Sequence, residues 1–278
     1  MARPDPTAPD SCPVCESREI RAGGIFSLPG FIRCRNCGLH YRKDLDSILQ
    51  PNQVYESDSS SVQRLIEEEP LRKSYYRSQA DRIESVVDFR GCLLEIGCGC
   101  GGLLAELASR GWSVEGIEPS PFLSAVAEKQ IGNRGIIHEK DFMEDGGSHC
   151  SRTYQVVIAI DVLEHLVAPQ VFIQQVSGML PRDGILILQT PNVKSLRRFI
   201  QGAGWEQYRP DEHPLLYSSK ALRHILTRAG FIMLHMKTIS GTAVESNGRS
   251  GWLRGVQKVL NSLHGGNTLW VACRKAAI

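Results

Sequence analysis

The 278-residue sequence lacks any hydrophobic run that approaches the ~20 apolar residues needed by a membrane-spanning helix. Its first residues, MARPDPTAPDSCP, also lack the apolar stretch of a signal peptide. We therefore expect a cytoplasmic protein without a membrane partner, and we interpret the start of the chain as a short disordered lead.

The sequence has no excess of one sign of charge. Its 32 Lys and Arg residues are nearly balanced by 30 Asp and Glu residues, which leaves a net charge of +2. Nucleic-acid-binding domains are usually more basic and gather that charge on one face. The small basic group Arg33, Arg35, Arg42 and Lys43 is interpreted as a solvated surface, so nucleic acid is a disfavoured but open partner.

Cysteine is more abundant than packing requires, with nine residues, four of them in two C-x-x-C pairs. The pairs are Cys12 with Cys15 and Cys34 with Cys37. This spacing is typical of a structural zinc ribbon, in which four thiolates complete the shell of Zn²⁺ and leave no open position. Free buried thiols or a redox pair are the alternatives. We expect His40 to be exposed rather than a ligand.

From residue 91 onward, apolar strand patterns alternate with helical ones. Strands are predicted at 92–97, 112–118, 135–141, 154–160 and 184–190, followed by 231–239 and 268–276, and helices at 101–111, 119–130, 171–180, 218–230 and 252–263. This alternation predicts an α/β fold with a doubly wound, mostly parallel sheet. The predicted domains are a zinc ribbon with its lead at 1–45, a helical linker and cap at 46–90, and the α/β domain at 91–278.

A glycine-rich turn follows the first predicted strand of the α/β domain. Gly97, Gly99 and Gly102 fit G-x-G-x-x-G, and a helix follows immediately, which indicates close approach of a ligand to the backbone. This motif alone fits NAD as well as S-adenosylmethionine (SAM). Three acids at strand ends favour SAM over NAD. Glu95 suits a cationic amino group, Glu118 can accept ribose hydroxyls, and Asp141 beside Phe142 can hold and cover an adenine.

The ordered motifs LLEIGCGCGG, GIEPS, KDF, AIDVLEHL and LPRDGILILQTPN resemble those of class I SAM-dependent methyltransferases. They are most similar to bacterial ubiquinone-type O-methyltransferases and to methyltransferases of sugar and secondary-metabolite pathways. The resemblance runs from about Tyr75 to the C-terminus. It implies a Rossmann-like seven-stranded sheet with an antiparallel last strand. It also implies SAM contacts from Glu95, Gly97, Gly99, Glu118, Asp141, Phe142 and Asp161.

Two histidines are candidates for the catalytic base. His165 follows the fourth predicted strand, and His213 lies in the segment after the fifth, where such enzymes place their acceptor. A purely structural role for each remains open. Tyr75, Tyr76 and Trp205 are candidates to line the acceptor pocket or to pack in the core.

The methyl acceptor is expected to be a small glycosyl or phenolic metabolite, modified on oxygen or carbon. The segment WEQYRPDEHPLLY carries both charge signs and several aromatics, which suits a compact pocket. An RNA methyltransferase whose ribbon recognises RNA is the first alternative. A non-catalytic module that binds SAM and a partner is the second. The sequence does not specify the oligomeric state.

Overall fold

The computed structural model describes residues 11–22, 28–45, 59–145, 153–239 and 265–276. The disordered lead and the helix at 252–263, both predicted from the sequence, lie outside these residues. None of the described helices is both long and apolar enough to cross a lipid bilayer.

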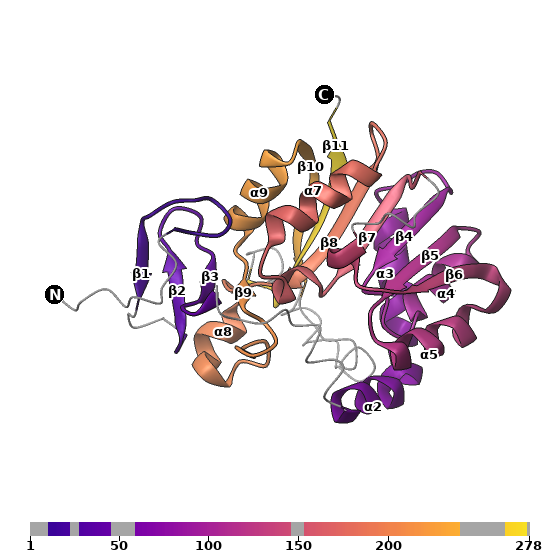
Figure 1. Ribbon diagram of the computed structural model, residues 1–278, viewed down its shortest axis with the longest axis horizontal. Coiled ribbons are helices and arrows are strands. Elements are labelled where there is room, and N and C mark those ends of the chain that lie inside the picture. The colour runs from indigo at the N-terminus through magenta and orange to yellow at the C-terminus, as the bar shows by residue number, and fades with distance from the viewer. Residues whose placement is uncertain (1–10, 23–27, 46–58, 146–152, 240–264, 277–278) are drawn as a thin grey trace, which may run out of the picture.

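A seven-stranded sheet forms the centre of the molecule, in the order β10-β11-β8-β7-β4-β5-β6 (Figure 1). Its strands are β4 (Cys92–Ile96), β5 (Ser113–Glu118), β6 (Gly135–Glu139), β7 (Val156–Ile160), β8 (Ile185–Pro191), β10 (Phe231–Ile239) and β11 (Thr268–Lys275). β11 pairs antiparallel with both β8 and β10, whereas β6, β5, β4, β7 and β8 run parallel. The predicted Rossmann-like sheet with its antiparallel last strand is confirmed.

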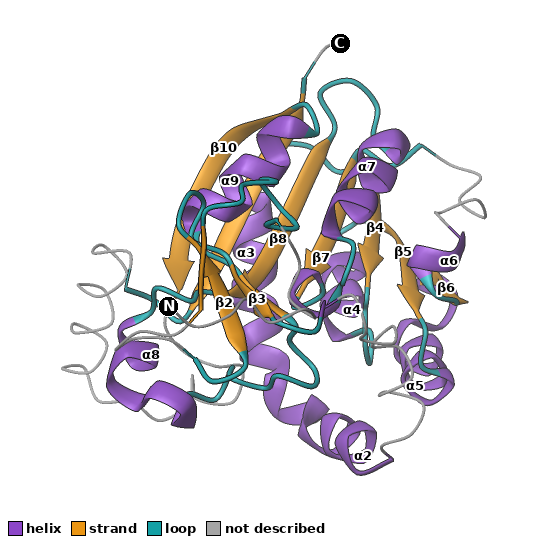
Figure 2. Ribbon diagram, turned by 60° about the vertical axis from the view of Figure 1, so that its left-hand side comes forward, coloured by secondary structure: helices purple, strands orange, loops and turns teal. Residues whose placement is uncertain are grey.

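Helices cover both faces of this sheet (Figure 2). α3 (Lys73–Glu84), α4 (Gly102–Ser109) and α5 (Pro121–Ile131) pack on one face, and α7 (Pro169–Met179) and α9 (Ser219–Arg228) on the other. Neighbouring strand residues alternate between the two cores: Leu93 packs with α3 and α4, and Leu94 with α7 and α9. Such strands are apolar on both sides because both faces are buried.

Two of the predicted helices begin at serine caps. Ser120 accepts a hydrogen bond from the backbone of Leu123 at the start of α5, and Pro121 occupies the first helical position. Ser218 accepts from the backbone of Ala221 at the start of α9. These side chains satisfy N–H groups that lack a partner within the helix.

A second, four-stranded antiparallel sheet carries the cysteine pairs and lies at one end of the molecule in Figure 1. Its strands are β1 (Ile20–Ala22), β2 (Phe31–Cys34), β3 (His40–Arg42) and β9 (Leu215–Leu216). β9 comes from the segment between β8 and α9, so this sheet is completed by the α/β part of the chain. The short helix α8 (Leu196–Gln201) lies beside this sheet.

The remaining elements are short or lie at the rim of the large sheet. α2 (Ser59–Glu68) leads through the 3-10 turn η2 (Glu69–Arg72) into α3. The others are α6 (Phe142–Asp145) and the 3-10 turns η3 (Gly132–Arg134), η4 (Leu163–His165) and η5 (Gly202–Gly204).

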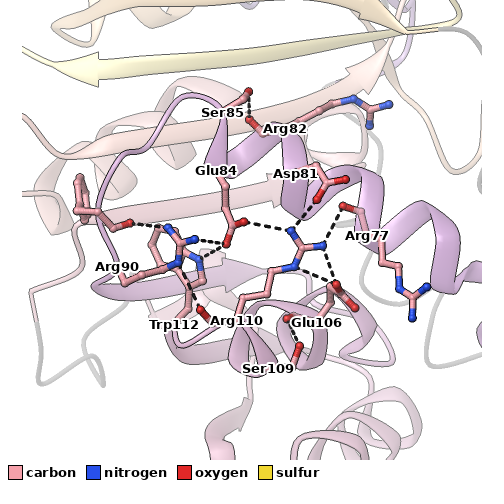
Figure 3. Close-up of polar contacts among 11 residues, drawn as sticks. Arg77, Asp81, Arg82, Glu84, Ser85, Arg90, Glu106, Ser109, Arg110 and Trp112 are labelled. Atoms are coloured by element: carbon pink, nitrogen blue, oxygen red, sulfur yellow. Dashed lines mark hydrogen bonds and ion pairs between the residues drawn. The ribbon is translucent and has the colours of Figure 1, made fainter.

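A polar cluster around Arg110 fixes α3 against α4 (Figure 3). The Arg110 guanidinium donates to Asp81 at 2.7 Å, Glu84 at 3.1 Å and Glu106 at 2.7 Å. The indole N–H of Trp112 also donates to Glu84, at 3.1 Å. Charge-assisted bonds of this kind are stronger than neutral ones, so the cluster holds α3 in place at the edge of the site described next.

Candidate functional site

One cavity of about 370 Å³ opens at the carboxyl ends of β4, β5 and β7. Open α/β sheets bind ligands in the crevice at this edge. The cavity brings together all nine residues for which the sequence predicted a cofactor or catalytic role. They are Glu95, Gly97, Gly99, Glu118, Asp141, Phe142, Asp161, His165 and His213.

The turn after β4 depends on glycine for its shape. The φ angle is +72° at Gly97 and +53° at Gly99, in the left-handed region that side chains disfavour. A Cβ atom at Gly97 would lie 2.6 Å from Val162 Cγ2, whereas one at Gly99 would meet nothing within 4 Å. The backbone at Gly99 therefore faces open space, and a ligand can approach it closely.

Glu95 places a buried carboxylate against this turn. Its side chain is 5% exposed, and its Oε2 has no hydrogen-bond partner in the described part of the chain. Burial and the like charges of Glu69 and Glu118 raise the pKa of Glu95 well above its ordinary value, while Arg72 acts in the opposite direction. An ammonium group would supply both the missing donor and the opposite charge. The amino group of the methionine part of SAM fits this requirement.

Glu118 ends β5, and backbone hydrogen bonds fix its orientation. One carboxylate oxygen accepts from the Gly99 N–H at 2.9 Å and the other from the Ser120 N–H at 3.0 Å. Burial raises the pKa of Glu118, and these two bonds lower it. Each oxygen keeps a second lone pair. The carboxylate can therefore still accept the two hydroxyls of a ribose.

Asp141 and Phe142 form the rim beyond β6. Asp141 accepts from the backbone of Met143 at 2.8 Å and caps α6. Phe142 packs edge-on against Phe172, with ring centroids 5.3 Å apart. This packing fixes an aromatic ring on the cavity wall, as contact with an adenine requires.

His165 and His213 lie edge to face, with ring centroids 4.7 Å apart. Nδ1 of His165 is 2.7 Å from the Glu212 carbonyl, and Nδ1 of His213 is 3.0 Å from the Gln207 carbonyl. Because a carbonyl oxygen only accepts, each Nδ1 carries the hydrogen and each Nε2 holds a lone pair. Burial lowers the pKa of His165 to about 3 and that of His213 to about 4. Both rings are therefore neutral at pH 7.

Glu164 lies beside the two histidines, although the sequence analysis did not single it out. Its Oε2 accepts the Thr190 hydroxyl at 2.9 Å. Burial and the charge of Asp161 raise its pKa well above the ordinary value. Glu164, His165 and His213 offer ligand atoms within 4.8 Å of one another, so this trio could also hold a metal ion.

Residues of the predicted linker and cap form another wall of the cavity. Arg72, Tyr75 and Tyr76 line it, and the Arg72 guanidinium lies 5.6 Å and 5.7 Å from the two ring centroids. Gln189 on β8 ties this wall to the sheet, because it donates to the Tyr75 hydroxyl at 3.0 Å and to Asp161 at 3.3 Å. Arg72 could not be found from the sequence, since an arginine between two helical segments belongs to no motif.

The four N-terminal cysteines converge in the ribbon. Their Sγ atoms all lie within 4.8 Å of one another. Cys12 and Cys37 are 3.6 Å apart, and Cys15 and Cys34 are 3.5 Å apart. Four thiolates about 2.3 Å from a tetrahedral ion would lie about 3.8 Å from each other. The hydrogen bond from Cys37 lowers the pKa of Cys12 to about 5, which favours the thiolate that a metal binds.

His40 and Trp205 are both buried. His40 was expected to be exposed, and this is wrong: it is 4% exposed, on a strand that lies between β2 and β9 in the four-stranded sheet. It also lies outside the cysteine cluster. Trp205 packs in the core rather than in the cavity; it is 1% exposed, and its indole N–H donates to Asn267 at 2.8 Å.

Comparison with known proteins gives one family and several relatives. A family model described as a methyltransferase domain matches residues 60–236. The ubiquinone biosynthesis O-methyltransferase of Azorhizobium caulinodans is 33% identical over 115 residues, which cover 40% of this chain and 45% of that protein. Its counterpart in Bradyrhizobium diazoefficiens is 31% identical over 142 residues, which cover 48% of this chain and 56% of that protein. The chain thus spans about half the length of these curated relatives.

Solved structures share the fold at low sequence identity. The magnesium protoporphyrin IX methyltransferase of Synechocystis PCC 6803 has a TM-score of 0.51 at 18% identity and covers 74% of this chain and 84% of its own. The N-methyltransferase NodS of Bradyrhizobium japonicum WM9 has a TM-score of 0.54 at 15% identity and covers 82% and 100%. The [4+2]-cyclase SpnF matches with a TM-score of 0.50 at 20% identity, covering 72% and 81%. The fold alone therefore does not fix the reaction.

Proposed function

Because the chain belongs to the methyltransferase-domain family, we propose that it transfers a methyl group from SAM to a small-molecule acceptor. One observation carries the proposal: nine residues selected from the sequence line a single cavity, and Glu95 there lacks the donor that an ammonium group would supply. Bound SAM would provide a methyl group already activated on a sulfonium.

In this proposal the chain's own residues hold the methyl donor, SAM, through complementary charge and shape. Glu95 accepts the amino group, the turn at Gly97 and Gly99 admits the ligand, and Glu118 accepts the ribose hydroxyls. Asp141 and Phe142 receive the adenine. Asp161, at the end of β7, lies on the cavity wall that these groups face. Arg72 adds a cation to the same cavity, which suits a carboxylate.

The proposed acceptor side contains His165 and His213. Their Nδ1 hydrogens are held by carbonyls, so each Nε2 can accept a proton from a hydroxyl or carbon acid of the acceptor. The remaining task of the chain is to orient the acceptor and to exclude water. Tyr75 and Tyr76 supply apolar surface for this purpose.

We favour an acceptor in the glycosyl or phenolic class. The curated relatives named above act in ubiquinone biosynthesis, and the cavity walls combine aromatic rings with a few oriented polar groups. Such walls suit a small ring system. The nearly balanced charge of the chain argues against RNA, whose phosphates require an excess of cations.

We also propose that Cys12, Cys15, Cys34 and Cys37 hold one structural Zn²⁺. The support is the set of sulfur separations, which suits tetrahedral coordination. Metal analysis of protein purified without added zinc should give about one equivalent per chain. Metal-free protein with four titratable thiols at these positions would contradict the proposal.

The central test separates binding from turnover. SAM binding is measured by calorimetry, and tritiated SAM is then supplied with pooled small metabolites or with total RNA. Label in the small-molecule fraction is expected. Salt-sensitive label in RNA would favour the RNA alternative, and SAM binding without label in either would favour the non-catalytic module. The assay is run with and without added Mg²⁺, since Glu164, His165 and His213 could hold a cation.

A further inference from the structure

We propose that Arg33, His40, Lys194 and Arg198 form a binding site for a phosphate or diphosphate group. We call these four residues the basic junction, because they lie where the ribbon meets the segment that follows β8. None of them lines the cavity described above.

The first observation concerns His40. It is 4% exposed, and neither ring nitrogen has a hydrogen-bond partner among the residues that the structure describes. A neutral imidazole always carries one donor and one acceptor, and leaving both unmade in a buried position costs free energy. A phosphate oxygen would accept the ring N–H, and a protonated phosphate would also satisfy the second nitrogen.

The second observation is the set of cations around this ring. Arg33 on β2 is in direct register with His40 on β3, so the two side chains lie on the same face of the ribbon sheet. Burial and the charges of Arg198, Arg33 and Lys194 lower the pKa of His40 to about 3. Three cations thus converge on one buried and unsatisfied ring.

The cations also act on one another. Burial and the charges of Arg33 and Arg198 lower the pKa of Lys194, and burial and Arg33 lower that of Arg198. No carboxylate in the described segments offsets these effects at His40 or Lys194. Like charges held together favour an anion between them, and Arg and Lys are the usual phosphate donors.

The position of the junction suggests which molecule carries the phosphate. Lys194 follows Thr190 by four residues, and Thr190 donates to Glu164 in the cavity wall. Four residues span at most about 14 Å. A nucleoside diphosphate with its substituent can cover such a distance. We therefore assign the junction to a phosphate carried by the methyl acceptor, a step that depends on the proposed function.

The test uses calorimetry on the full chain with inorganic pyrophosphate and with UDP. The variants R33M and K194M change exposed residues and should keep the fold. R223M and K129M, which are exposed on α9 and α5, are the matched controls. H40L removes both ring nitrogens, and its folding is checked by circular dichroism.

Wild-type protein should bind pyrophosphate, and R33M, K194M and H40L should each weaken binding about tenfold, while the controls should not. UDP that binds at least as tightly supports a phosphate carried on a larger acceptor. Much weaker UDP binding overturns that assignment. Absent binding, or equal binding in all variants, overturns the site itself.

Two further measurements separate the competing explanations. A short single-stranded RNA is titrated in parallel. If R33M and K194M weaken RNA binding but leave pyrophosphate binding unchanged, the junction is a nucleic-acid surface and the proposal fails. SAM affinity is measured in the same samples. Its absence in wild-type protein would contradict the proposed methyl transfer without affecting the pyrophosphate result.

Discussion

At the residue scale, the cavity contains buried acids whose charge a cationic ligand would balance. The pKa values of Glu95, Glu118 and Glu164 are all raised, chiefly by burial. Glu118 is the most constrained of them, because two backbone N–H groups already hold it in position. Arrival of a ligand cation would favour the charged form of the nearest acid.

Glu118→Ala should weaken SAM binding by about 1–3 kcal/mol, because the ribose hydroxyls and the Gly99 N–H would lose their acceptor. Calorimetry measures the change directly. Glu128→Ala, on an exposed position of α5, is the matched control and should bind SAM as the wild type does. Unchanged affinity in Glu118→Ala would remove Glu118 from the donor site.

His213 gives a prediction about pH and stability. Its folded pKa of about 4 lies below the ordinary value of 6.5, so the unfolded chain binds more protons between these two pH values. The stability contribution is complete above pH 6.5 and is lost as the pH falls toward 4.

Between pH 7.5 and 5.5, the unfolding free energy of the wild type should therefore fall by about 1 kcal/mol more than that of His213→Gln. Urea denaturation at the two pH values measures both losses. The buried acids titrate in both proteins, so their contributions to the two losses of unfolding free energy cancel when one loss is subtracted from the other. Equal losses would show that His213 titrates normally in the folded protein.

At the scale of elements, α3 connects stability to the site. It carries Tyr75 and Tyr76 into the cavity, and on its far side the Arg110 cluster holds it to α4. Close packing reinforces this contact, since a Cβ at Gly102 would lie 2.2 Å from the Tyr76 ring.

Arg110→Met should lower the unfolding free energy by roughly 1–2 kcal/mol, in the lower part of the range for charged hydrogen bonds because solvent screens the partly exposed cluster. Urea denaturation measures the loss. Arg223→Met, at an exposed position of α9, should change stability by less than about 0.5 kcal/mol. A similarly small change in Arg110→Met would mean that the cluster does not hold α3.

The large sheet could be predicted from sequence because its signals are local. Strands such as β4 and β7 are short apolar runs, and α5 and α9 begin at serine caps. The glycine turn and the acids at strand ends follow from the same order along the chain. The nine candidate residues could therefore be chosen without knowledge of distance, and they line one cavity.

Other features could not be predicted because they depend on contacts between distant segments. β9 is only two leucines, and it becomes a strand by pairing with β3. The same pairing makes β3, which carries the buried His40, an interior strand of its sheet. Arg72 enters the cavity because α3 packs on the sheet, and no local pattern indicates that packing.

At the scale of the whole molecule, the ribbon and the α/β part share their interior. Cys12, Cys34 and Cys37 pack in the same core as residues of α7 and α9. The Ser218 hydroxyl at the start of α9 also donates to the Cys37 carbonyl at 2.6 Å. The predicted boundary at residue 45 thus divides the sequence, while β9 joins the two parts in space.

Removal of the proposed zinc ion should therefore disturb the proposed methyl transfer as well as the ribbon. Leu215 of β9 follows His213 by two residues and pairs with Tyr41, so a loosened ribbon would release His213 from its position. We expect a chelator, in the presence of reductant, to lower the Tm and to reduce the methylation rate about 10–100-fold. SAM affinity should persist, because Glu95 and Glu118 lie on β4 and β5.

Cys15→Ser should reproduce the effect of the chelator, and Cys92→Ser, outside the cluster, should not. Restored activity on addition of Zn²⁺ would support this coupling, and metal-free protein with an unchanged rate and Tm would contradict it.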